Sequence, residues 1–135
     1  MNASDWTLQV DPEGRLRGLY GAGGLPLEAC ELFYLQIDER ERSATLGFET
    51  GRLPPNPPPE WGQRPYNTVE FFVAFTNTSE IFLSGWNPSA RAGVALAPHG
   101  TGSVRVSLEH ADSRLRFTAT GAAVTRVRPY LAGGE

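Results

Sequence analysis

Apolar and polar residues alternate along many short segments of this chain, which is the pattern of β-strands. The densest runs are Val69–Thr76 and Ile81–Trp86, and Asn77-Thr78-Ser79 between them carries side chains typical of turns. The two runs therefore predict an antiparallel β-hairpin. Phe72 and Phe82 fall on the faces opposite the main apolar rows, so we expect protein on both sides of this hairpin and a central place in the fold.

The N-terminal segment shows the same alternation over shorter stretches. It predicts a strand at Trp6–Val10, a turn at Asp11–Gly14 and a partner strand at Leu16–Tyr20. Pro26 follows a glycine-rich stretch and favours the start of one helical turn. No long helix is expected here.

Short arms joined by turns continue through the rest of the chain. Phe33–Ile37 and Ala44–Phe48 predict a second hairpin, and its charged tip, Asp38–Arg42, is interpreted as a solvated loop. The remaining expected strands centre on Val94–Leu96, Val104–Leu108, Leu115–Ala119 and Val124–Leu131, the last of these as an edge strand or a short helical turn.

The segment Leu53–Trp61 is too rich in proline to join a sheet interior, because proline lacks the amide proton. We expect an extended, polyproline-like crossover on the surface, with Trp61 covering one end of the core. The alternative is that this proline run docks into a groove of a partner.

These patterns predict an all-β fold, an antiparallel meander that forms a sandwich or a curved sheet with at most one or two short helical turns. The 15 glycines and 11 prolines favour many turns over long helices. A length of 135 residues suits one domain spanning residues 1–135.

Charge and cysteine content indicate which classes of partner and which cellular compartment to expect. The net charge is −3 without a local basic patch, so nucleic acid and anionic lipid are not expected partners. The single cysteine, Cys30, has no partner for an internal disulfide and indicates a reducing compartment. No signal peptide and no membrane-spanning run is recognised. We expect a cytoplasmic protein.

Residues that could carry chemistry do not form a recognisable set. His99 and His110 lie in predicted turns without metal-ligand spacing. Ser84 lacks the glycine pattern of a nucleophile elbow, and Gly100–Ser103 is not followed by a phosphate-binding helix. The sequence therefore predicts no catalytic, cofactor-binding or metal-binding residue, and no enzyme.

An ordered set of segments resembles a known family. The segments are Leu35–Glu39, Ala44–Glu49, the proline-rich loop ending in Glu60-Trp61, Tyr66–Phe71 and Ile81–Trp86. Together, over roughly Phe33 to Arg128, they resemble the immunity protein 50 family of bacterial polymorphic toxin systems. The resemblance implies a small, mostly β, cytoplasmic protein that neutralises a cognate toxin by binding it, without catalytic residues. An acidic surface would suit a basic toxin.

Three hypotheses follow. In the first, an immunity-like protein binds its toxin through a face that includes the proline-rich loop. The contact residues expected there are Glu60, Trp61, Tyr66 and Asn67. In the second, a small-molecule-binding protein or enzyme has an apolar pocket on a curved sheet. The residues expected to line that pocket are Phe71, Phe72, Phe82 and Trp86. In the third, the protein self-associates through an edge strand, so that it is a homodimer rather than a monomer.

Overall fold

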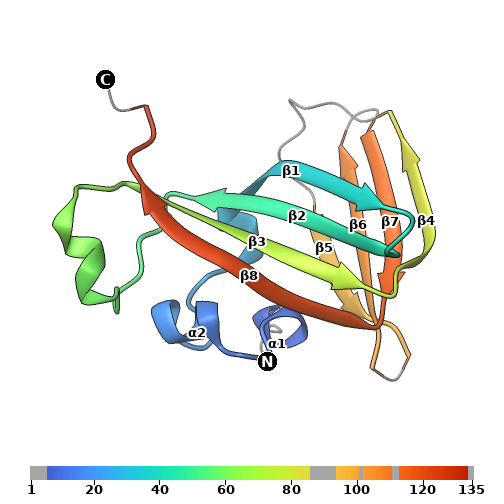
Figure 1. Cartoon of the computed structure of the whole chain (residues 1–135), viewed down its shortest axis with the longest axis horizontal. Coiled ribbons are helices and arrows are strands. Elements are labelled where there is room, and N and C mark those ends of the chain that lie inside the picture. Colours follow the sequence, from blue (N-terminus) through green and yellow to red (C-terminus); the bar gives the residue numbers. More distant parts are fainter. Residues whose placement is uncertain (1–5, 86–93, 101, 111–112, 134–135) are drawn as a thin grey trace.

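The computed structural model describes residues 6–85, 94–100, 102–110 and 113–133, and its strands form two antiparallel sheets. The first sheet contains β1 (Cys30–Asp38), β2 (Ser43–Thr50), β3 (Thr68–Thr76) and β8 (Gly121–Tyr130), in that order. The second sheet contains β4 (Ser79–Ser84), β7 (Ser113–Ala119), β6 (Val104–His110) and β5 (Val94–Pro98), in that order (Figure 1). This architecture confirms the predicted all-β antiparallel class.

The two sheets are joined at a corner where two neighbouring strands pass from one sheet into the other. β3 continues into β4, and β7 continues into β8 beside them (Figure 1). The antiparallel pairing holds on both sides of the bend, because Thr76 pairs with Gly121 before the corner and Ser79 with Thr118 after it. Strands that bend and switch sheets in this way are typical of two sheets packed crosswise.

The predicted hairpin between Val69–Thr76 and Ile81–Trp86 is therefore wrong. β3 lies between β2 and β8, whereas β4 pairs with β7 at the edge of the second sheet. A two-residue hairpin with a type I′ turn needs positive φ at both central residues, and within residues 77–79 only Asn77 has a positive φ, 53°. The next residue, Thr78, is buried and donates its N–H to the carbonyl of Arg42 at the tip of the β1–β2 hairpin. The expected central position holds for β3 and fails for β4.

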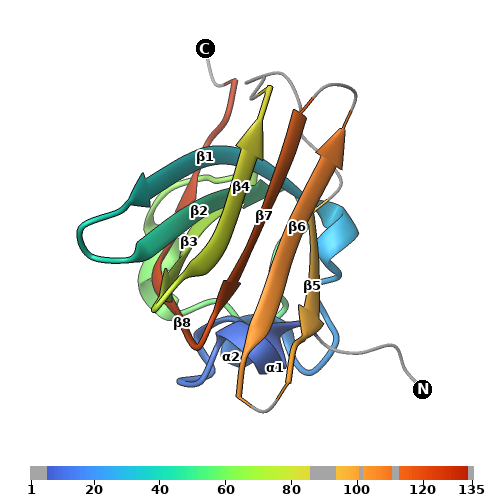
Figure 2. The same cartoon turned by 90° about the vertical axis from the view of Figure 1, so that its right-hand side faces the viewer.

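One hydrophobic core lies between the inner faces of both sheets and the N-terminal segment. The second sheet crosses the first near one end (Figure 2), and there Phe75 meets Phe117 edge to face with 5.3 Å between ring centroids. Further along the first sheet, Trp6 stacks on Phe71 at 5.9 Å and lies 6.3 Å from Phe48. We call the opposite face of the first sheet, which points away from this core, its outer face.

The N-terminal segment forms two short helices, so the strands expected at Trp6–Val10 and Leu16–Tyr20 are wrong. α1 spans Thr7–Val10 and α2 spans Arg15–Tyr20. Both helices contact β8 (Figure 1). They contribute to the shared core that covers the inner face of the first sheet.

Asp11 explains why α2 begins where it does. Its carboxylate is buried and accepts hydrogen bonds from the backbone N–H groups of Arg15, Leu16 and Arg17, at 2.8, 2.8 and 3.2 Å. These donors have no partner inside the helix, so the carboxylate stabilises its first turn. The buried residues of α2 are Leu16, Leu19 and Tyr20, a helical spacing that the strand interpretation overlooked.

The other predicted elements are present. β1 and β2 form the expected hairpin, and β5, β6, β7 and β8 lie at the expected positions, with β8 at an edge. A 3₁₀ helix at Leu27–Ala29 follows Pro26. The proline-rich segment joins neither sheet and ends in a second 3₁₀ helix, η2 (Pro59–Gln63), from which Trp61 packs against the core.

Candidate partner-binding site

A groove opens at the end of the first sheet, between the loop before β3 and the end of β8. Its volume is about 680 Å³, and its walls are residues 60, 61 and 63–66 on one side and residues 128–131 on the other. Trp61 and Tyr66 line it and meet edge to face, with 5.6 Å between ring centroids and 85° between ring planes. We call this the Trp61 groove. Paired rings of this kind offer a large and pre-ordered contact surface.

Three of the four residues expected to contact a partner lie in the Trp61 groove. Glu60, Trp61 and Tyr66 line it. Asn67 instead fastens the far wall, because its side-chain amide bonds both to the carbonyl of Ala132 at 3.2 Å and to its N–H at 2.8 Å. Its backbone N–H also donates to the carbonyl of Tyr130 at 3.1 Å. Asn67 thus positions the wall formed by the end of β8.

A row of three glutamates crosses the outer face of the first sheet beside the groove. Glu31 on β1 lies opposite Glu49 on β2, which lies opposite Glu70 on β3. We call these residues the acidic row. Arg128 on β8 ends the row and donates from Nε to Glu70 at 2.8 Å. Like charges on directly opposite residues are unfavourable in an antiparallel sheet, and the bond from Arg128 offsets part of this repulsion at Glu70.

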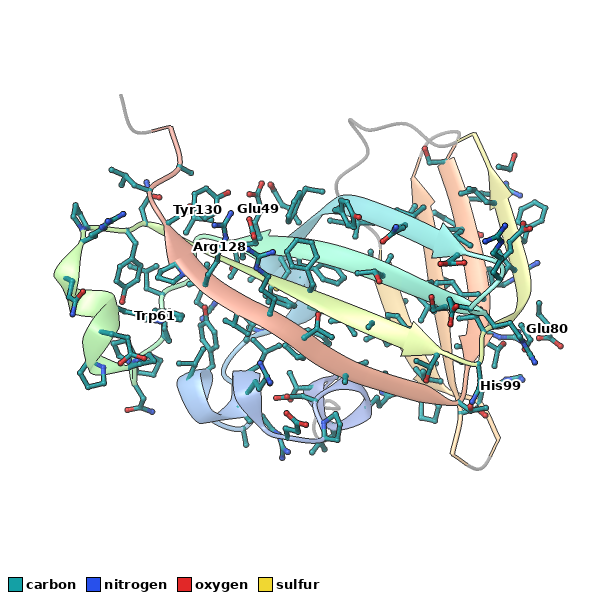
Figure 3. The ribbon with its side chains drawn as sticks, viewed as in Figure 1. Glu49, Trp61, Glu80, His99, Arg128 and Tyr130 are labelled. Carbon is teal, nitrogen blue, oxygen red and sulfur yellow. The ribbon has the colours of Figure 1, made fainter. Side chains whose placement is uncertain are left out.

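Tyr130 connects the acidic row to the groove. Its hydroxyl donates a hydrogen bond to Glu49, and Figure 3 shows Tyr130, Glu49 and Arg128 close together at the same end of the molecule as Trp61. This hydrogen bond, followed by burial and the negative charge of Glu49, raises the pKa of Tyr130 to about 12. The hydrogen bond to Glu70 likewise raises the pKa of Arg128. The hydroxyl and the guanidinium thus keep their protons and hold two carboxylates in place.

Three aromatic side chains form a cluster on the next row of the outer face. Phe33, Tyr34 and Phe72 contact one another, with ring centroids 5.5–6.4 Å apart. Gly47 makes room for them, because a Cβ there would lie 2.7 Å from Cε2 of Phe72 and 2.8 Å from Cβ of Tyr34. Phe33 and Tyr34 are each 39% exposed. We call these three residues the aromatic trio.

The apolar pocket expected from Phe71, Phe72, Phe82 and Trp86 is not assembled. Phe71 is fully buried in the core, whereas Phe72 points to the outer face of the same strand, because neighbouring strand residues point to opposite sides. Phe82 lies on the second sheet and is 45% exposed. Trp86 lies outside the described residues. These phenylalanines do not line one cavity, which corrects the proposed pocket.

The described residues bring together few groups of chemical interest apart from this site. No group of three or more His, Cys, Asp or Glu side chains in that part of the chain could hold a metal ion. The ring of His99 lies 3.4 Å from the guanidinium of Arg105, and Ser84 ends the exposed strand β4. Burial raises the pKa of the Cys30 thiol to about 12. Over the same described ranges, none of the helices is long and apolar enough to cross a membrane.

Sequence reasoning missed the acidic row and the aromatic trio. Each glutamate of the row stands at an outward position of a strand, next to inward residues such as Phe48 and Phe71. That alternation was a usable signal for an outer face. What the sequence lacks is the register, since only strand pairing shows that Glu31, Glu49 and Glu70 fall in one line.

Comparison with known proteins identifies a family. The model of the family Immunity protein 50 matches residues 15–130. No curated protein and no solved structure matches the chain.

Proposed function

Because the chain belongs to the immunity protein 50 family, we propose that it neutralises a cognate bacterial toxin by binding it directly, without catalysing a reaction. The observation that carries this proposal is the Trp61 groove. It combines a pair of ordered aromatic rings with charged residues at its rim, which is the composition of a protein-binding hot spot.

The proposed contacts come from both walls of the groove. Trp61 is half-buried, so a partner can still cover its remaining surface, and Tyr66 fixes the orientation of the indole. Glu60 is exposed beside them and supplies a polar contact at the rim. Asn67 contributes indirectly, through the wall that it fastens to Ala132. We propose the cytoplasm as the site of binding, with which the buried thiol of Cys30 is compatible.

Growth rescue tests this function. Toxin domains encoded beside the gene are expressed in a bacterial host, alone and together with this protein, and binding of the purified pair is measured by calorimetry. We expect the wild-type protein to restore growth and to bind one toxin. The double variant Trp61→Ala/Tyr66→Ala should lose at least tenfold in affinity, because hot-spot residues contribute about 2 kcal/mol or more each.

The matched control is Leu53→Ala, which removes an exposed apolar side chain from the same loop outside the groove. It should rescue growth as the wild type does. Failure of the wild-type protein to protect against any of the neighbouring toxins would overturn the proposed function. Protection that persists in the double variant would retain the function and reject the groove as its site.

A further inference from the structure

Building on the proposed function, we infer that the part of the toxin that fills the Trp61 groove is an extended, proline-rich segment in the polyproline II conformation. Such a segment offers backbone carbonyls as hydrogen-bond acceptors but few N–H donors, because proline has none. The groove has the opposite character, since donors predominate among the polar groups of its side chains and stand beside apolar rings. The two surfaces are therefore complementary.

The first observation is the supply of donors in the groove. One wall carries the indole of Trp61, the amide of Gln63 and the guanidinium of Arg64, and it adds the carboxylate of Glu60 as an acceptor. Across the described part of the chain, none of the first three groups donates a hydrogen bond to another residue. A partner segment that is rich in carbonyls and poor in N–H groups suits this supply.

The second observation is the apolar surface beside these donors. The rings of Trp61 and Tyr66 stand at 85° to each other, and Leu131, which is 49% exposed, continues the apolar surface on the opposite wall. Proline-rich segments dock in aromatic-lined grooves because they are already extended before they bind and lose little conformational entropy. A volume of about 680 Å³ suits a short peptide segment rather than a single side chain.

The third observation is the wall formed by the end of β8. An extended peptide beside an edge strand could instead pair with that strand as a further member of the sheet. Pro129 lies in this wall and has no N–H to donate, and proline at the edge of a sheet hinders such pairing. The groove therefore favours a peptide that binds through rings and side-chain donors.

Trp6 provides the contrast within the same molecule. Its indole N–H donates to the carbonyl of Leu25 at 2.7 Å, and Leu25 is the residue that precedes Pro26. Trp6 is buried, so this contact is satisfied inside the chain. Trp61 is half-buried, and its indole N–H donates to no acceptor among the described residues. On Trp61 the same contact is left for a partner.

A titration without the toxin tests the groove. Indole and amide resonances of the isotope-labelled protein are followed by NMR while blocked hexaproline is added, and a blocked glycine–serine peptide of the same length serves as the control ligand. We expect hexaproline alone to shift the indole resonance of Trp61, whereas that of Trp6 should stay in place because its N–H is already bonded. An unmoved Trp61 indole, or equal shifts with both peptides, would overturn the inference.

Matched variants separate the donors from the rings. Trp61→Phe keeps an aromatic ring and removes the indole N–H, so it should weaken hexaproline binding about fivefold, as expected for the loss of one hydrogen bond. Gln63→Ala/Arg64→Ala removes two exposed side chains and should have a similar effect without disturbing the fold. Leu53→Ala, outside the groove, should leave the affinity unchanged. Wild-type affinity in both groove variants would contradict the proposed role of the donors and overturn the inference.

The toxin that the rescue experiment identifies provides a second arm. Hexaproline at about ten times its dissociation constant should weaken toxin binding about tenfold by competition, whereas the glycine–serine peptide should have no effect. Undisturbed toxin binding would reject the inference while leaving the proposed function standing. A protein that protects against no toxin would reject the proposed function, and the titration would still decide whether the groove accepts a proline-rich segment.

Sedimentation of the free protein tests the competing occupant, the proline-rich segment Leu53–Trp61 of a second copy. We expect a monomer, because the groove is reserved for the toxin. A dimer that Trp61→Phe dissociates would place the segment of the second copy in the groove and would overturn the inference.

Discussion

β3 and β4 are consecutive strands of similar apolar content that end in opposite environments. β3 lies between two neighbours, and its inward residues Phe71, Val73 and Phe75 are at most 1% exposed. β4 is the edge of the second sheet, and all of its residues are exposed, including Phe82 at 45% and Leu83 at 44%. The change happens at the corner, where the chain leaves the middle of one sheet and enters the edge of the other.

Alternation of apolar and polar residues therefore predicts a strand but not the number of its neighbours. Burial depends on what pairs beside a strand and packs over it. β3 has a neighbouring strand on each side and the core against its inner face, whereas β4 pairs with β7 alone. β4 has an irregularity that is common in edge strands. Its pairing with β7 shifts register between Ser79 and Phe82, and Glu80 has a φ of 56°. Such an irregularity makes an edge a poor template for another strand.

The sharpest way to test this contrast is to truncate one side chain in each strand. Phe71→Ala on β3 should lower the free energy of unfolding by about 3–5 kcal/mol, because it opens a cavity under Phe48 and Trp6. Leu83→Ala on β4 should cost less than about 1 kcal/mol, since Leu83 is already 44% exposed at the edge of the sheet. Urea denaturation of both variants checks this, and equal losses would contradict the assignment of β4 as an exposed edge.

A smaller effect is expected at the outer face of the first sheet, where Gly47→Ala on β2 forces a methyl group against Phe72 on β3 and Tyr34 on β1. Overpacking of this kind should cost about 1–3 kcal/mol. Gly62→Ala is the matched control, because its added Cβ meets no atom within 4 Å and its backbone needs no positive φ. Urea denaturation measures both, and a Gly47→Ala protein as stable as the control would show that the trio can move aside at no cost.

The two phenylalanines that point outward from these strands give a closer comparison. Phe72→Ala should lower the free energy of unfolding by about 1–2 kcal/mol, because it removes ring contacts worth about 0.5–1.5 kcal/mol each. Phe82→Ala removes only an exposed cation–π contact with Arg116 and should cost below about 1 kcal/mol. Thermal denaturation ranks the pair, and the reverse order would place the better-packed ring on β4.

The weakest effect should appear only at alkaline pH. The pKa of Tyr130 rises from its ordinary 10.0 to about 12 in the folded protein, so its hydrogen bond to Glu49 contributes fully below pH 10 and is lost as the pH rises through 12. Stability of the wild type measured by urea denaturation between these values should fall more steeply than that of Tyr130→Phe. If the stability of the two proteins fell equally with pH, the hydroxyl of Tyr130 would not be bonded to a carboxylate. Tyr20, whose pKa burial raises, is present in both proteins.

Much of the fold could be predicted from local pattern, and the failures share a cause. The β1–β2 hairpin was predictable because its apolar faces and its charged tip agree. The corner was not, because Asn77 and Thr78 have turn chemistry whether a chain reverses or bends, and the deciding bond comes from Arg42, distant in sequence. The N-terminal helices were missed because Trp6–Val10 fits periods of two and four equally well over so short a length.

The same distinction applies to the candidate site, where local pattern reveals some residues and only strand pairing reveals the others. Trp61 and Tyr66 were accessible to sequence reasoning because large aromatic residues in a proline-rich loop are candidate contacts on composition alone. Glu49 and Tyr130 were not, since they stand 81 residues apart and meet only through the pairing of β2, β3 and β8. Sites built within one loop can be predicted from a sequence, and sites built across a sheet need its register.

The joining of β3 to β8 has a consequence for the time at which the protein becomes active. Glu70 and its partner Arg128 are 58 residues apart along the chain, a stretch that a ribosome adds in about 3–12 s at about 5–20 residues per second. Until then β3 has no neighbour on one side, Glu70 lacks its partner Arg128, and the far wall of the groove is absent. The protection that we propose therefore begins for each molecule only when its last strand has emerged.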